Sequence, residues 1–537
     1  MNIRIVPALF CAALLAAAQA PAEVKPAALF SDHMVLQSGM AVPVWGIADP
    51  GERVTIKLNG QTKSATADAD GKWTVRLAKL KAGGPFTMTI AGKKGSAPIV
   101  VNDVLVGEVW LGSGQSNMVF NVSQKNHRPY GLLDEDKEIA AANYPQVRMF
   151  TVADTKSLTP QIDAKGIWKV CSPETVPDFS AVGYLFARDL NQALKVPVGI
   201  VLSAYGASTA EAWIPREALA ADPLLEPILA GFDTREAAYK AHPPAPPSTP
   251  EAAPATPPAP LADAAPATPG TPPAGARPAR RARGGGGDPV NDQHQPTVLY
   301  NGMISPVIPY AIRGAIWYQG ESILGNPGIP MYSHIMETLV TEWRKRWNEG
   351  NFPFYAVQLA ALKNNSNNPR VREQQAAILS VPNTGLAVTI DIGDPANVHP
   401  KNKEPLGDRL SRIALANVYG HKMEFSGPVY ASMKVEGGAI RLQFTHAQGL
   451  TAKDGPLKWF QIAGADHHYV DAEATIDGDT VVVRSPEVAA PVSVRYAWDN
   501  YPDGANLYNA AGLPAVPFRT DKADEPPPAA PAPPKGR

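Results

Sequence analysis

The first part of the chain consists of short segments in which apolar and polar residues alternate, and turn residues separate these segments. An Asn-Gly pair stands at 59–60 and an Asp-Gly pair at 70–71, next to runs that alternate with a period of two. These dipeptides are the strongest short signals for tight β-hairpins. The pattern predicts a small β-sandwich over residues 23–102.

From residue 103 the pattern changes to continuous apolar runs that alternate with stretches of helical periodicity. The runs predict buried strands at 196–202, 314–318, 354–359 and 385–390, and the periodic stretches predict helices near 180–194, 331–348 and 370–380. Such alternation specifies a parallel sheet with helices on both faces, which we expect over residues 103–425. Short alternating strands return over 426–520 and predict a second β-rich domain.

Two segments are rich in proline and alanine and poor in large apolar residues. One interrupts the middle domain at 243–289, and the other is the tail at 521–537. Neither can bury enough apolar surface to offset the entropy of ordering, so we expect both to be disordered.

The chain begins like an exported protein. Arg4 precedes an apolar stretch at 5–18, and small residues follow up to Ala22. This order is typical of a secretory signal peptide over residues 1–22 and predicts a secreted or periplasmic protein. Cys171 is then the single cysteine of the mature chain, so no intramolecular disulfide is expected.

Length and charge narrow the functional classes. The 537 residues exceed one hydrophobic core, and a net charge of −1 does not provide the basic surface that nucleic-acid binding needs. No later apolar stretch is long enough to span a bilayer. No cluster of His, Cys and Asp has the spacing of a metal site, so neither a metal nor a cofactor is expected. The oligomeric state stays open.

The most informative motif is Gly-Gln-Ser-Asn-Met at 114–118, which directly follows the apolar run 104–111. Glycine at the end of a strand permits a sharp turn that leaves a serine hydroxyl, here Ser116, accessible as a nucleophile. Met118 stands where the lipase motif G-x-S-x-G has its second glycine, so this motif is a different one. By itself, such a cluster after a strand also fits a plain turn.

Further motifs accompany this one along the chain. They are Leu-Tyr-Asn-Gly-Met at 299–303, Trp-Tyr-Gln-Gly-Glu-Ser at 317–322, Asp-Ile-Gly-Asp at 391–394, His-Pro-Lys-Asn-Lys at 399–403, and two late motifs at 495–498 and 506–514. With these motifs in this order, the chain resembles the sialate O-acetylesterase family of SGNH hydrolases, which remove acetyl groups from glycans. The resemblance covers most of residues 25–520. It implies the three-layer SGNH fold, in which helices cover both faces of a parallel sheet, with β-rich domains at both ends.

Ester hydrolysis by serine needs a base that takes the hydroxyl proton. The resemblance implies Ser116 as the nucleophile and His399 as this general base. His399 follows a late strand, from where an imidazole can face the nucleophile across the carboxyl edge of the sheet.

The acid partner of the histidine departs from the family pattern. The common D-x-x-H motif needs aspartate at position 396, where Ala396 stands, and Asn397 occupies the other usual place. We expect Asp394 to be the acid, while Asp391 or a backbone carbonyl at 396 or 397 stays open as the partner. Alternatively, both aspartates cap their own loop.

A second requirement is a set of donors for the oxyanion that forms on the substrate. The resemblance implies three candidates: the backbone amides of Ser116 and Gly206 and the side-chain amide of Gln319, which stands where SGNH hydrolases have asparagine. Alternatively, Gln319 is a buried amide bonded to the backbone. Asn117 is expected to bind or orient the substrate. Glu321 is expected to orient loop amides rather than to act on the ester.

Together these features predict a secreted carbohydrate O-acetylesterase that forms an acetyl-enzyme intermediate, with an acetylated glycan or sugar as its partner. The glycan stays open between acetylated sialic acids and plant cell-wall polymers such as xylan or xyloglucan, because loops around the site determine that choice. A non-catalytic glycan-binding protein on the same fold is the alternative of another class, since the usual aspartate is missing.

Overall fold

The computed structural model of the chain describes residues 24–93, 97–125, 130–242, 288–323, 328–363 and 367–521. The predicted signal peptide at 1–22, nearly all of the 243–289 segment and the tail beyond residue 521 lie outside these ranges. Across the described ranges, no helix is both long and apolar enough to span a membrane.

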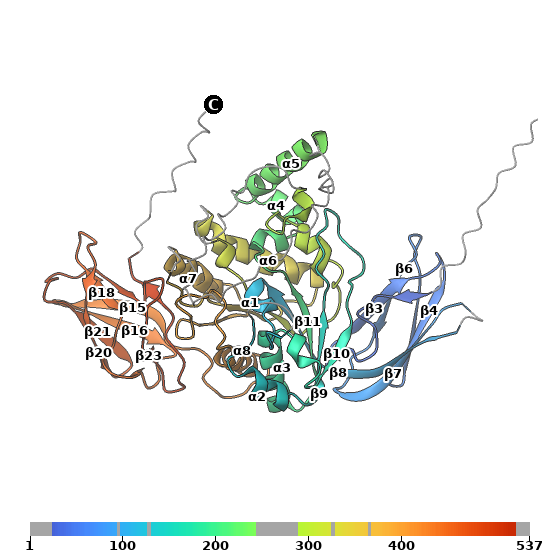
Figure 1. The fold of residues 1–537 in the computed structure, drawn as a ribbon, viewed down its shortest axis with the longest axis horizontal. Helices are drawn as coiled ribbons and strands as arrows, with labels where there is room; N and C mark the ends of the chain where they lie inside the picture. Colours follow the sequence, from blue (N-terminus) through green and yellow to red (C-terminus); the bar gives the residue numbers. More distant parts are fainter. Residues whose placement is uncertain are drawn as a thin grey trace, which may run out of the picture.

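A mostly parallel sheet occupies the middle of the molecule, and β-rich regions flank it on both sides (Figure 1). In sheet order its strands are β10 (Trp168–Cys171), β9 (Tyr144–Thr151), β11 (Val198–Ala204), β8 (Ile99–Gly114), β12 (Gly314–Tyr318), β13 (Phe354–Val357) and β14 (Thr384–Ala387). Neighbours run parallel, except that β10 is antiparallel to β9. Gly114 at the end of β8 therefore lies opposite Ala204 and Tyr318, at the carboxyl edge of the sheet.

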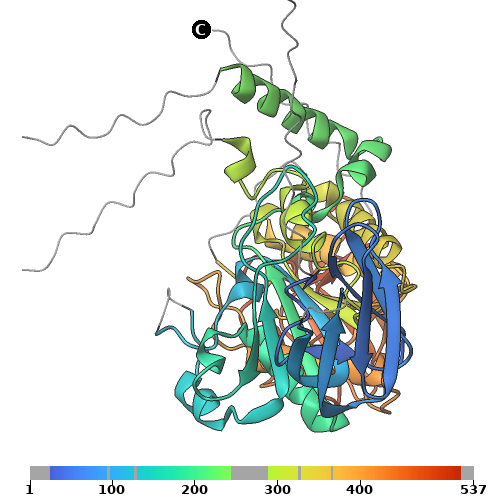
Figure 2. The same ribbon diagram turned by 90° about the vertical axis from the view of Figure 1, so that its right-hand side faces the viewer.

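Helices and short turns connect these strands. The described helices are α1 (Ser116–Val119), α2 (Glu135–Ala141), α3 (Ala181–Leu194), α4 (Arg216–Ala221), α5 (Glu226–Ala241), α6 (Tyr332–Trp347), α7 (Asn368–Ala376) and α8 (Glu404–Asn417). Short 3-10 or π turns lie at Val176–Asp178, Ala210–Trp213, Pro289–Asn291, Tyr300–Ile304, Glu321–Ile323, Ile329–Met331 and Ala377–Ser380. Figure 2 shows α5 standing apart from the sheet at one end of the molecule.

Both faces of the central sheet are buried, because successive side chains of a strand point to opposite sides. On one side, Trp110 of β8 packs edge-on against Phe186 of α3 with 5.1 Å between ring centroids, in a core that α8 completes. On the other side, Trp317 of β12 packs edge-on against Trp343 of α6 at 5.9 Å. Continuous apolar strands thus fill two cores, as their sequence pattern predicts.

The N-terminal β-rich region shares a strand with the central sheet. Its strands are β1 (Lys25–Pro26), β2 (Val35–Gln37), β3 (Val42–Ile47), β4 (Arg53–Leu58), β5 (Gln61–Thr66), β6 (Lys72–Leu77) and β7 (Gly83–Ala91). The Asn-Gly pair at 59–60 forms the turn of the β4–β5 hairpin. β8 pairs with β7 and β2 along its first half and with β11 and β12 along its second half, so it crosses the boundary expected at residue 102.

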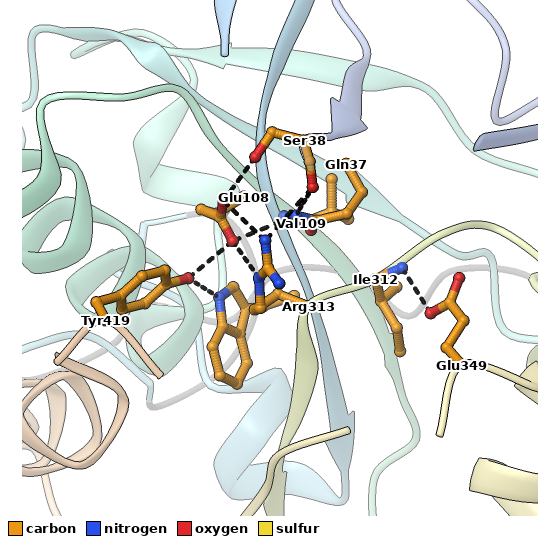
Figure 3. A network of polar contacts seen from close by, with 9 residues as sticks. Gln37, Ser38, Glu108, Val109, Ile312, Arg313, Glu349 and Tyr419 are labelled. Carbon is orange, nitrogen blue, oxygen red and sulfur yellow. Dashed lines mark hydrogen bonds and ion pairs between the residues drawn. The ribbon is translucent and has the colours of Figure 1, made fainter. Parts of the chain in front are cut away.

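A buried polar network fastens this junction (Figure 3). Glu108 of β8 accepts hydrogen bonds from Ser38 Oγ at 2.8 Å and Tyr419 Oη at 3.0 Å. Arg313, just before β12, donates to the same carboxylate from Nε at 2.5 Å and Nη2 at 3.2 Å. Glu108 lies near the amino ends of β11 and β12, so this network holds the edge of the sheet opposite to Ser116.

The C-terminal β-rich region packs against the carboxyl edge of the sheet. It consists of β15 (Val429–Glu436), β16 (Ala439–Thr445), β17 (Thr451–Ala452), β18 (Phe460–Ala463), β19 (Val470–Asp471), β20 (Glu473–Asp477), β21 (Thr480–Arg484), β22 (Ser493–Tyr496), β23 (Leu507–Tyr508) and β24 (Phe518–Arg519). Arg372 of α7 is fully buried and donates to the carbonyl oxygens of Asp499 at 2.8 Å and Asn500 at 3.0 Å. These bonds join the region to the segment that follows β13.

Candidate active site

Ser116 occupies the first position of α1, directly after the turn that ends β8. Gly114 in this turn has φ +131°, and a Cβ there would lie 2.2 Å from the carbonyl oxygen of Tyr318, so the turn requires glycine. The backbone N–H of Gln115 donates to that same oxygen at 2.9 Å, and its side-chain oxygen accepts from the amide of Gly320 at 3.3 Å. The end of β12 and the residue two positions after it therefore hold the serine turn through the backbone and the side chain of Gln115.

His399 meets this serine across the carboxyl edge of the sheet. Its Nε2 lies 2.8 Å from Ser116 Oγ, and its backbone N–H donates to Asn397 Oδ1 at 2.9 Å. The ring of Tyr130 stands edge-on to the imidazole at 5.0 Å between centroids. Burial, and after it the charge of Lys403, lower the pKa of His399 to about 4. The imidazole is therefore neutral at pH 7 and able to accept a proton.

Asp394 does not take the position expected of the acid partner. Its Oδ1 accepts hydrogen bonds from the backbone amides of Ala396 at 2.8 Å and Asn397 at 2.9 Å. The carboxylate thus caps the turn that leads to His399, which is the loop-capping alternative that the sequence left open.

Asp391 is also occupied elsewhere. It forms a two-pronged ion pair with Arg409 of α8, with contacts of 2.8 and 2.6 Å, and accepts from Tyr508 Oη at 3.0 Å. In the described part of the chain, no carboxylate or backbone carbonyl accepts a hydrogen bond from Nδ1 of His399.

Two backbone amides near the serine are available as donors. Within the described residues, the N–H groups of Ser116 and Gly206 donate to no acceptor, and the first of them lies at a helix N-terminus. Gln319 is placed differently from the expectation. Its fully buried carboxamide donates to the carbonyl of Ser208 at 3.1 Å and accepts from Tyr332 Oη at 2.7 Å, which is the buried-amide alternative.

Behind the serine lies a buried polar cluster that consists of Asn117, Glu321 and Lys403. Asn117 Nδ2 donates to Glu321 Oε1 at 2.5 Å, and its Oδ1 accepts from Lys403 Nζ at 2.5 Å. Burial lowers the pKa of Lys403 to about 7, against the opposing effect of the Glu321 charge. Burial likewise raises the pKa of the Glu321 carboxyl group. Glu321 thus orients a side-chain amide, where backbone amides were expected.

Sequence reasoning missed Lys403. A lysine at the start of an amphipathic helix is normally predicted to be exposed to solvent, yet Lys403 is only 1% exposed. The only available signal was its position four residues after His399, on the turn before α8.

Comparison with known proteins shows which proteins this chain is similar to. The family model described as "Carbohydrate esterase, sialic acid-specific acetylesterase" matches residues 282–416, which include His399 and Lys403. The sialate O-acetylesterases of rat and human are each 28% identical to this chain, with 92% of this chain covered and 93% and 91% of theirs. A crystal structure of a carbohydrate acetylesterase from Xanthomonas citri is 34% identical, covers 93% of this chain and 100% of its own, and has a TM-score of 0.77.

The chain belongs to the sialate O-acetylesterase family. The match extends over both β-rich regions as well as the α/β centre, so the whole architecture is that of this family of carbohydrate esterases. Ser116 precedes the segment that the family model matches, whereas Glu321 and His399 lie inside it.

Proposed function

We propose that this member of the sialate O-acetylesterase family is an exported O-acetylesterase that uses Ser116 as nucleophile and His399 as general base, on an α/β centre of the SGNH type. The observation that carries the proposal is the 2.8 Å contact between Ser116 Oγ and His399 Nε2. A serine hydroxyl within hydrogen-bond reach of a neutral imidazole is the arrangement that activates this nucleophile.

In the first half of the reaction, Ser116 Oγ attacks the acetyl carbonyl while its proton moves to His399 Nε2. The carbonyl oxygen becomes an oxyanion, and the amides of Ser116 and Gly206 supply its hydrogen bonds. When the tetrahedral intermediate collapses, the C–O bond to the sugar breaks and the imidazolium returns its proton to the sugar oxygen. The sugar leaves as an alcohol, and Ser116 carries the acetyl group.

In the second half, His399 takes a proton from a water molecule that attacks the acetyl-enzyme. The new intermediate collapses to acetic acid, and the proton on Nε2 returns to Ser116 Oγ. One ester and one water thus give one alcohol and one acetic acid, which ionises at neutral pH. No step needs a metal or a redox cofactor.

The proposed substrate is an O-acetylated sugar, in line with the names of the relatives. Their names differ between sialate and carbohydrate acetylesterase, so acetylated sialic acids and acetylated cell-wall glycans both stay within the proposal. The apolar stretch in residues 1–22 supports export to the periplasm or the medium.

Hydrolysis of p-nitrophenyl acetate by wild type and by Ser116→Ala tests the proposal. We expect turnover in the wild type and its loss in the variant without a change in thermal unfolding, because a partly exposed hydroxyl contributes little packing. Mass spectrometry of the rapidly quenched wild type should find one acetyl group on Ser116. A panel of acetylated sialic acids, xylan and xyloglucan then identifies the glycan. A wild type that binds these glycans but releases no acetate supports the non-catalytic alternative instead.

A further inference from the structure

Lys403 lies in an unusual environment for a charged group. Its Nζ sits 4.9 Å from the ring centre of Phe120 and 5.0 Å from that of Tyr318, in a pocket closed to solvent. The one hydrogen bond that Nζ donates in the described part of the chain goes to Asn117 Oδ1. The charged or titratable groups that act on it are the carboxyl group of Glu321 and the imidazole of His399. The adjacent Glu404 is exposed and lies 3.6 Å from Arg188.

The side chain of Asn117 connects three parts of the active site through a single carboxamide. Its Oδ1 accepts from Lys403, and its Nδ2 donates both to Glu321 and, at 3.0 Å, to the carbonyl oxygen of Val398. Ser116 precedes Asn117 in sequence, and His399 follows Val398. The carboxamide therefore spans the gap between the nucleophile turn and the loop that carries the base.

An amide side chain needs an acceptor for its N–H groups and a donor for its oxygen to be held in one orientation. Glu321 and Val398 provide the acceptors, and Lys403 provides the donor. Without the ammonium group, Asn117 Oδ1 would be buried without a donor, and a half-satisfied buried network is the less stable arrangement. Lys403 thus determines which way the carboxamide faces.

We propose that Lys403 is a positioning residue for ester hydrolysis: through Asn117 it fixes the Ser116 turn against the His399 loop, and its charge acts on the imidazole. This inference rests on the proposed function. The second effect follows from charge repulsion, since an ammonium near an imidazole disfavours the imidazolium and so lowers the pKa of His399. Glu321 partly offsets that charge, and its Oε2 is buried with no partner among the described residues.

The test compares Lys403→Met with Lys401→Met in the full-length enzyme. Methionine fills the same apolar pocket, but loss of the ammonium leaves the buried Glu321 carboxyl group without its counter-charge, so the variant should unfold at a lower temperature and kcat is compared per folded molecule. Lys401 is the matched control: it lies two residues away on the same loop, is half-exposed, and its Nζ donates to Gln124 Oε1 at 3.3 Å. Both variants lose one positive charge within four residues of His399.

For Lys403→Met we expect kcat on p-nitrophenyl acetate to fall by about 10- to 100-fold with little change in KM, because the reacting groups and not the substrate lose their alignment. The acid limb of kcat/KM should move to higher pH, toward the ordinary histidine pKa of about 6.5, because a repelling charge is gone. Lys401→Met should match the wild type in both respects. Lys403→Arg, which keeps the charge, should keep the wild-type acid limb.

A folded Lys403→Met enzyme with an unmoved acid limb overturns the inference even if kcat falls, because general loosening of the fold would produce that result. Equal losses in Lys403→Met and Lys401→Met also overturn it. If Lys403→Met does not fold, Asn117→Ala decides, since it removes the bridge alone, and wild-type kcat in that variant is the contrary outcome. Absence of acetate release from the wild type would instead remove the proposed function itself.

Discussion

Asp394→Asn separates two mechanisms that predict very different rates. In the structure, Asp394 Oδ1 holds the amides of Ala396 and Asn397, and an asparagine oxygen can accept the same two bonds. The change then costs only the charge-assisted part of the bonds, about 1 kcal/mol of local stability. If Asp394 instead supported the imidazolium of His399, the loss in kcat would be about 10⁴-fold, which corresponds to about 5 kcal/mol.

We expect Asp394→Asn to retain kcat on p-nitrophenyl acetate within a few-fold of wild type and to unfold at a slightly lower temperature. Asp68→Asn is a matched control, because Asp68 Oδ1 caps a turn of the N-terminal region in the same way, with bonds of 2.9 Å to the amides of Asp70 and Lys72. A 10⁴-fold loss of kcat in a folded Asp394→Asn enzyme, with the Asp68 variant unaffected, would refute the capping role and restore Asp394 as the acid.

Three further outcomes follow from the same structure. Burial and then the Lys403 charge lower the pKa of His399 to about 4, so wild-type kcat/KM should stay level from neutral pH down to about pH 5 and fall only below it; a fall near pH 6.5 would contradict this. Asp391→Asn should lower the free energy of unfolding in urea by about 3 kcal/mol, because it leaves the Arg409 guanidinium, 8% exposed, without an opposite charge, while kcat per folded molecule persists. Joining residues 244 and 288 by a short flexible link should preserve hydrolysis of p-nitrophenyl acetate, since the Pro/Ala-rich composition of 245–287 supplies no core; inactivity of a folded deletion variant would place that segment at the active site.

Elements with a strong period were predictable from the sequence. The apolar run 314–318 is β12, and the helices expected near 180–194 and 331–348 are α3 and α6 with ends within one residue. The path of β8 was not predictable in the same way. A run of mostly apolar residues shows that a strand is buried but not which sheet it joins, and here it joins two in succession.

In the candidate site, too, some features were predictable from the sequence and others were not. Motif order was enough to select Ser116 and His399, because the carboxyl edge of a parallel sheet brings such loops together, and the structure places them 2.8 Å apart. The direction of a carboxylate within its loop depends on local turn geometry, which spacing alone does not encode. Asp394 therefore looked like a partner of the imidazole and instead caps its own turn. The burial of Lys403 depends on Phe120 and Tyr318, which are distant in sequence.

The surroundings of His399 bear on how the two charges that form during hydrolysis, the imidazolium and the oxyanion, are stabilised. His399 has no carboxylate on Nδ1 among the described residues and a cation nearby, so its imidazolium is less stabilised than in a serine triad. A base of low pKa is a weaker acceptor for the serine proton, and the oxyanion donors must then supply more of the stabilisation. The backbone amides of Ser116 and Gly206, which donate to no acceptor among the described residues, are the groups that we propose for this role. Because its pKa is low, His399 stays unprotonated and able to act as a base at mildly acidic pH, where a histidine of ordinary pKa would be largely protonated.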